Sequence, residues 1–247
     1  MNVLGYSERG VLYALWHEIA TRGPLADDLL HALIAQVAFP FTNSHLPAGN
    51  VQILPEQSFS DFGEADALIL IDGQPDRPCS IFVEAKVKTL QYTNWLITDE
   101  WAEFEFGLRR RMNSSNLFAQ LYHKLQLVEA LRKGGIRVVE QGVQFPHWSS
   151  KQLRKIGGNE VVLEAARLLL PRVKETFFAM IVPDQADRMQ AFFDQTLRNA
   201  VLPSVPLWVV TYFGYITWAQ IRAFCQVNDL HRTLAVLDFN GEQIYGP

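Results

Sequence analysis

Three charged residues, Asp66, Glu84 and Lys86, stand in apolar segments where a buried strand would not be expected to carry charge. The first segment, 64–72, reads EADALILID, and the second, 79–88, reads CSIFVEAKVK. Two carboxylates can hold a hard cation such as Mg²⁺, whose preferred ligands are oxygens. A lysine beside them could orient a water or stabilise charge that develops on a phosphate. These residue types therefore predict metal-assisted phosphate chemistry, with Asp66 and Glu84 as the metal ligands.

This chemistry requires the two carboxylates to lie on one face of a hairpin. Side chains alternate across a strand, so Phe82, Glu84 and Lys86 are expected to share a face while Val83 points to the other. The turn that joins the two segments decides whether Asp66 stands opposite Glu84. A slip of one residue in the strand pairing would turn Asp66 away, so the predicted site depends on the register.

The surrounding elements follow from periodicity and from turn and cap signals. Helical spacing predicts helices at 6–23, with Ser7 as the N-cap, and at 25–39, 114–135, with a serine cap, 159–173 and 184–201. Runs rich in residues that favour strands predict strands at 51–59, 64–72, 79–88, 176–183 and 206–213, with 136–145 as a further candidate strand and 89–112 unassigned. This order predicts an α/β fold in which helices flank a central mixed sheet.

Length and composition indicate one globular domain spanning residues 1–247, with a core at 7–132 and an α/β extension at 133–247. Two cysteines, Cys79 and Cys225, do not suffice for a disulfide framework or a four-thiolate zinc site. The N-terminus lacks the pattern of a secretory signal, and the apolar segment 205–219 is too short to span a bilayer comfortably. We therefore expect a cytoplasmic protein with no membrane partner.

The charge distribution bears on the partner. The net charge of −4 is mildly unfavourable for binding nucleic acid, because basic side chains dominate phosphate contacts. Between residues 86 and 155, however, basic side chains outnumber acidic ones, which favours a local anion-binding face. Within this region, Arg109–Arg111 could contact phosphate or form a solvated turn. An unevenly charged surface without a partner is the alternative.

The residues of the hairpin also carry a family resemblance. Asp66, an intervening turn and Glu84-Ala85-Lys86 resemble the PD-(D/E)xK nuclease superfamily, and the predicted order of a helix, three strands, a helix and a strand is similar to its restriction-endonuclease-like core. The resemblance implies cleavage of phosphodiester bonds with Mg²⁺ or Mn²⁺, with Asp66 and Glu84 as metal ligands and Lys86 at the attacking water. Ala65 stands where the motif often has a proline.

The resemblance extends to two helical residues. Gln120, in NLFAQLYHKL, resembles the polar residue that many such nucleases place near the metal or the scissile phosphate, and Lys124 lies one turn further on the same face. Many members carry an acidic residue on the first helix, and Glu8 is preferred to Glu18 because it lies one turn before the apolar stripe. A glutamate in the first turn of a helix is also favoured by the helix dipole alone.

Aromatic and histidine side chains are further candidates for the site. Four aromatic residues could stack on bases, but aromatic residues are more often in the core: Trp95, Trp101, Phe104 and Phe106. No histidine shows metal-ligand spacing, and His123 is of interest only because it lies beside the candidate site.

The sequence as a whole predicts a metal-dependent nuclease, with DNA as the expected substrate and a homodimer as a compatible assembly. One alternative is a catalytically inactive module of nuclease-like fold that binds nucleic acid or another protein. A second is an enzyme that acts on a small phosphorylated molecule. For Asp66, Glu84 and Lys86 themselves, the alternative is an ion pair across the strands of a solvent-facing hairpin.

Overall fold

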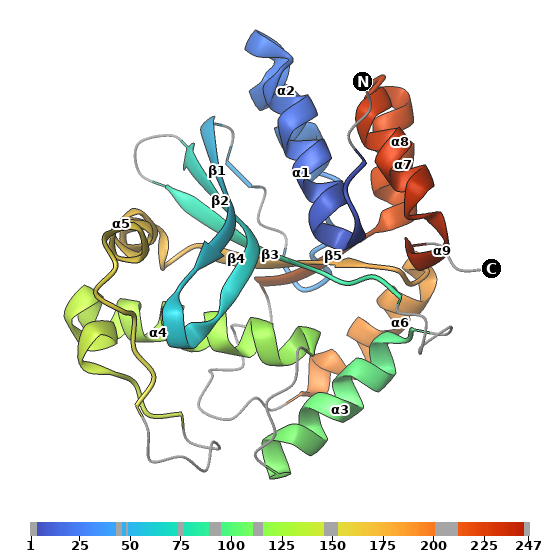
Figure 1. The fold of residues 1–247 in the computed structure, drawn as a ribbon. Coiled ribbons are helices and arrows are strands. Elements are labelled where there is room, and N and C mark those ends of the chain that lie inside the picture. Colours follow the sequence, from blue (N-terminus) through green and yellow to red (C-terminus); the bar gives the residue numbers. More distant parts are fainter. Residues whose placement is uncertain are drawn as a thin grey trace.

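A five-stranded mixed sheet, with its strands in the order β1-β2-β3-β4-β5, forms the centre of the molecule (Figure 1). The computed structural model describes residues 4–42, 46–47, 49–73, 77–88, 95–110, 116–145, 153–200 and 212–244, with the backbone alone at 108–110. The strands are β1 (Gly49–Ser58), β2 (Glu64–Gly73), β3 (Cys79–Ala85), β4 (Thr176–Val182) and β5 (Phe213–Thr217). The first three are antiparallel, and β4 and β5 run parallel to β3 and to each other.

Helices cover both faces of this sheet, which confirms the predicted α/β class (Figure 1). One face is covered by α1 (Ser7–Ala20), α2 (Ala26–Ile34), α7 (Trp218–Val227), α8 (His231–Phe239) and the short α9 (Gly241–Ile244). The other is covered by α3 (Ile97–Arg110), α4 (Leu117–Gln141), α5 (Glu160–Leu169) and α6 (Ala186–Gln195). Short 3-10 turns are η1 (Gly23–Leu25), η2 (Ser60–Phe62), η3 (Leu170–Arg172) and η4 (Leu197–Asn199).

The pairing of β2 with β3 answers the question of register. Ala67 pairs with Val83, so Asp66 and Glu84 each lie one residue beyond this pair and point to the same face of the sheet. Apolar residues follow the same alternation, since Ile69 packs in the layer of α1 while Phe82 packs in the layer of α4. The two carboxylates therefore project toward α4.

Segments from the C-terminal half complete the sheet next to this hairpin. Strand β4 pairs with β3, with Phe178 opposite Phe82, and β5 lies beyond β4. The chain passes from β5 directly into α7, as expected for an apolar strand that runs into a helix, and Thr217 caps α7 through a capping box with Gln220. Of the predicted strand at 206–213, residues 206–211 lie outside the described residues.

Several local expectations are corrected by the structure. The candidate strand at 136–145 is wrong, because α4 continues to Gln141 past a break at Gly135, whose φ of 66° a glycine adopts without strain. Short apolar runs rich in β-branched residues do not distinguish strand from helix by periodicity alone. The unassigned segment contains α3. Asn116 caps α4 instead of a serine, with its side chain accepting the Phe118 and Ala119 N–H groups.

The N-terminus of α1 is capped from a distant part of the chain. Ser7 was expected to act as the N-cap, but it is the first residue of α1, and the N-cap residue Tyr6 makes no side-chain cap bond. The Ser7 N–H donates instead to Asn240 Oδ1 at 2.9 Å. The Asn240 amide in turn donates to the Gly5 carbonyl at 2.9 Å. A residue just after α8 thus holds the start of α1, which is a long-range contact that no local pattern could signal.

In the part of the chain that the structure describes, none of the helices has the length and apolar character that crossing a bilayer would need.

Glu18, near the end of α1, caps the start of α8, just as Asn240 caps the start of α1. Its buried carboxylate accepts the N–H groups of Arg232 and Thr233, at 3.1 and 2.7 Å, and the Thr233 hydroxyl at 2.8 Å. The first N–H groups of a helix have no partner within the helix, so a carboxylate there is stabilising.

Replacing Glu18→Ala should lower the free energy of unfolding by about 2–3 kcal/mol, because buried donors lose a charged acceptor. Urea unfolding followed by circular dichroism measures this change. Glu164→Ala is a matched control on α5, where the side chain is 57% exposed, and it should change stability little. Equal unfolding midpoints for the two variants would contradict the assigned role of Glu18.

Candidate active site

Asp66 lies where the pairing between β2 and β3 ends. Its Oδ2 atom accepts the Ala85 N–H at 2.7 Å, so a side chain takes the place of a strand partner and locks Asp66 beside the end of β3. Burial raises the pKa of Asp66, while the Ala85 N–H and the Lys86 ammonium act in the opposite direction. Nearby Glu8 raises the pKa further. Asp66 is therefore fixed in position within a group of charges.

Glu84 is completely buried on β3 and forms an ion pair with Lys124 on α4. Lys124 Nζ lies 3.0 Å from Glu84 Oε1, and the two side chains expose 1% and 0% of their surface. Among the described residues, neither Glu84 oxygen has a hydrogen-bond partner, so the contact of Oε1 with Lys124 is an ion pair. Burial raises the pKa of Glu84 to about 7, an effect that Lys124 opposes and the charge of Asp66 reinforces.

Lys86 is held at its backbone and at its side chain. Its N–H donates to the Ile181 carbonyl of β4 at 2.9 Å, and its carbonyl accepts the Trp218 indole N–H of α7 at 2.7 Å. Lys86 Nζ donates to Gln120 Oε1 at 2.5 Å. Gln120 thus places the ammonium group of Lys86, and the structure brings these two predicted residues into direct contact.

Glu8 stands at the N-terminal end of α1, close enough to Asp66 to raise the pKa of its carboxyl. The next residue, Arg9, pairs with Glu56 and Glu64, at 3.3 Å in each case. These strand residues border Asp66 on β1 and β2, so they tie the start of α1 to the edge of the site. Glu18, the other acidic residue of this helix, instead contacts the start of α8.

Glu100, on α3, is a neighbour of the site that the sequence did not reveal. Its carboxylate accepts the Trp95 indole N–H at 3.1 Å and the Leu117 N–H at 2.8 Å, so it joins α3 to the start of α4. Burial raises the pKa of Glu100, and the charge of Lys86 lowers it. The segment from 89 to 112 had no readable period, so α3 was not predicted. The position of Glu100 in the first turn of this helix is the one feature that could have pointed to it.

Other candidates from the sequence lie elsewhere. His123 is buried against Phe145, with ring centroids 5.5 Å apart, and burial lowers its pKa to about 3, so it remains neutral. Trp95, Trp101 and Phe104 are core residues, whereas Phe106 is 47% exposed. The side chains of Arg109–Arg111 lie outside the described residues. Within the described ranges, no group of three or more His, Cys, Asp or Glu side chains is arranged to hold a metal ion.

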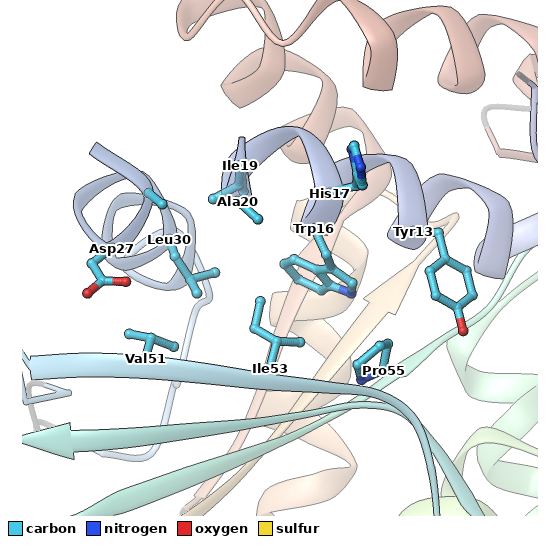
Figure 2. A pocket seen from close by; sticks show the side chains of 11 residues that line it. Tyr13, Trp16, His17, Ile19, Ala20, Asp27, Leu30, Val51, Ile53 and Pro55 are labelled. Carbon is cyan, nitrogen blue, oxygen red and sulfur yellow. The ribbon is translucent and has the colours of Figure 1, made fainter. Parts of the chain in front are cut away.

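A separate pocket of about 380 Å³ lies between helices α1 and α2 and the edge strand β1. Figure 2 shows its mainly apolar wall, in which Trp16 of α1 and Leu30 of α2 face Ile53 of β1. Asp66, Glu84 and the residues around them do not line it. The pocket offers apolar surface without paired carboxylates, so it is distinct from the candidate active site.

The site residues are chemically suited to a hard divalent cation. Glu84 has a buried oxygen without a hydrogen-bond partner in the described part of the chain, and Asp66 offers a second carboxylate that raises the pKa of Glu84. A cation between two such groups would offset their repulsion, and oxygen ligands are those that Mg²⁺ and Mn²⁺ prefer. Asp66 and Glu84 therefore fit the metal that the sequence led us to expect.

Comparisons of the chain with models of protein families, with curated proteins and with solved structures find no match. The geometry of these residues is consequently the ground on which a function can be proposed.

The raised pKa of Glu84 predicts how metal-free stability depends on pH. Between pH 4.5 and about 7, Glu84 is protonated in the folded state and ionised in the unfolded state. The stability that protonated Glu84 contributes is therefore complete below pH 4.5 and is lost as the pH rises through about 7. The shift corresponds to about 3 kcal/mol. Urea unfolding between these pH values, in the presence of EDTA, should show wild-type stability falling relative to Glu84→Gln. Parallel pH profiles would contradict the shift.

Proposed function

We propose that the chain is a metal-dependent nuclease of the PD-(D/E)xK type that hydrolyses phosphodiester bonds, with DNA as its substrate. One observation carries the proposal: Asp66 and Glu84 project from the same face at the end of the β2–β3 pairing, and Lys86, held by Gln120, follows immediately. A merely solvent-facing ion pair is a poor account of this arrangement, because Glu84 is fully buried and its partner is Lys124 on a helix.

In the proposed reaction, Asp66 and Glu84 hold Mg²⁺ or Mn²⁺, which when bound lowers the pKa of water and polarises the phosphate. Lys86 donates a hydrogen bond to the attacking water or to a phosphate oxygen and stabilises the negative charge that grows there. Gln120 keeps the ammonium of Lys86 in one place, and the Trp218 indole keeps its backbone there. Such prior alignment reduces the reorganisation that the reaction would otherwise require.

Glu8 assists this arrangement from the first turn of α1. Its carboxylate adds negative charge next to Asp66, which favours the binding of a cation. The same carboxylate can accept a hydrogen bond from a water bound at the site. The contact between Ser7 and Asn240 fixes the part of the helix from which Glu8 projects.

The second candidate is a module of nuclease-like fold without turnover that binds nucleic acid or a protein. The ion pair of Glu84 with Lys124 favours it, since a carboxylate that has a resident cationic partner is stable without metal. An enzyme for small phosphate esters is distinguished by salt, because binding of a polyanion weakens steeply with salt concentration.

Lys86→Ala should reduce cleavage at least about 100-fold, because a donor to the developing charge is lost. The assay uses a panel of single- and double-stranded DNA and RNA, with Mg²⁺ or Mn²⁺. Lys174→Ala, at an exposed lysine that lies outside the site, is the matched control and should cleave like the wild type.

Circular dichroism and metal titration should show that Lys86→Ala keeps its fold and its metal. Equal cleavage by Lys86→Ala and the wild type would exclude the proposed role of this lysine. Absence of cleavage by the wild type on every substrate, together with salt-sensitive binding of nucleic acid, would favour the module without turnover.

Glu8→Gln should lower cleavage by about 10- to 100-fold, the usual effect of removing a group that supports metal ligands. Because its side chain is not part of the core, the urea midpoint should remain that of the wild type. Glu18→Ala should give the opposite pattern, with lower stability and unchanged turnover per folded molecule. If Glu18→Ala instead abolished turnover while folded, the choice between these two glutamates would be reversed.

A further inference from the structure

Lys124 is as deeply buried as the Glu84 carboxylate that it contacts, and the proposed hydrolysis gives it no task. Its ammonium lies 3.0 Å from Glu84 Oε1 and also donates to the Glu64 carbonyl. Gly63, with φ of 83°, forms the turn beside it, and a Cβ atom at this position would stand 3.3 Å from Lys124 Nζ. The backbone at the start of β2 and the carboxylate on β3 thus form a closely fitting binding site for the ammonium group of Lys124.

A lysine buried at this position lowers the stability of the fold through its desolvation. Moving an ammonium and a carboxylate from water into the interior carries a desolvation cost that their attraction often fails to recover, and replacing both members of such a pair by apolar residues of similar volume is frequently neutral or stabilising. Lysine is rarely buried to this extent unless it is paired. The charge of Lys124 therefore has its effect on the group it contacts, which is Glu84.

The ion pair with Lys124 makes the two oxygens of Glu84 unequal as metal ligands. Both oxygens are buried without a hydrogen-bond partner among the described residues, and it is Oε1 that lies 3.0 Å from the ammonium of Lys124 in the ion pair. Two-oxygen ligation of a metal by Glu84 would require Oε1 to leave Lys124. The positive charge next to Glu84 also opposes a cation that approaches from the other side.

We propose that Lys124 is a positioning residue that limits Glu84 to one metal-ligating oxygen and keeps the affinity for the metal ion low in the absence of substrate. This inference rests on the proposed metal-dependent function. With Lys86 and Lys124 offsetting the carboxylates of Asp66, Glu84 and Glu8, the site attracts a divalent cation weakly. A phosphate of the substrate supplies the missing negative charge, and Mg²⁺ commonly binds through one or two carboxylates together with substrate phosphates. Metal and substrate then bind cooperatively.

Lys124→Met tests this inference, because methionine fills a similar volume without charge. Isothermal titration with Mn²⁺, in mildly alkaline buffer and without nucleic acid, should show binding at least about tenfold tighter than that of the wild type, since a nearby positive charge is removed. Lys133→Met is the matched control. It lies on the same helix and removes the same charge, but its side chain is 66% exposed and pairs with Glu129, so Mn²⁺ affinity should not change.

The outcomes separate this inference from the proposed function. If the wild type binds Mn²⁺, Glu84→Gln abolishes binding and Lys124→Met binds no more tightly than the wild type, the inference is overturned while the metal site stands. If neither the wild type nor Lys124→Met binds Mn²⁺, both are overturned. Binding by Lys124→Met alone would support the inference in its strongest form.

A variant that does not fold without metal is also informative. Lys124→Met leaves Glu84 as an uncompensated buried charge, which is strongly destabilising. Mn²⁺ should then restore the helical circular dichroism of the variant and raise its unfolding temperature more than that of the wild type. Absence of any Mn²⁺ effect on this variant would overturn the inference. Lys124→Arg keeps the charge, and it should bind Mn²⁺ with an affinity closer to that of the wild type than to that of Lys124→Met.

Discussion

The buried ion pair between Glu84 and Lys124 is the interaction on which the positions of the other site residues depend. A carboxylate in the middle of a covered sheet is tolerated only if a partner is held against it, and α4 provides that partner from across the layer. The position of α4 is in turn set by Asn116 and Glu100 at its first turn. Gln120, on the same helix, therefore reaches Lys86 as a result of the packing that brings Lys124 to Glu84.

Charges from both sides of the sheet meet at one end of it. Asp66 and Glu84 project toward α4, while Glu8 belongs to a helix of the opposite layer, and Lys86 follows the last residue of β3. The parallel neighbour β4 extends past this point and accepts the Lys86 N–H, so the backbone remains ordered where the antiparallel pairing has stopped. The end of the hairpin is thus held by hydrogen bonds to β4 and to α7.

Sequence alone could predict the strands and which residues of one strand share a face, because the alternation of side chains along a strand is a local property. Alternation along 79–88 places Phe82, Glu84 and Lys86 on one face, but it leaves open whether Asp66 stands opposite Glu84, and the pairing of Ala67 with Val83 in the structure decides this. Supports such as Asn240 and Trp218 could not be foreseen, since they act on residues more than one hundred positions away. The pairing of Lys124 with Glu84 was equally hidden, because a helical face shows which side chains are neighbours but not what they meet.

The contact between Asn240 and the start of α1 has a consequence for the order in which the molecule is made. Synthesis proceeds from the N-terminus, and domains begin to fold while the chain is still growing. The hairpin with Asp66, Glu84 and Lys86 leaves the ribosome more than 100 residues before Asn240, the residue that holds the helix of Glu8. A growing chain can therefore contain every charged residue of the site and yet lack the arrangement until Asn240 has also been added.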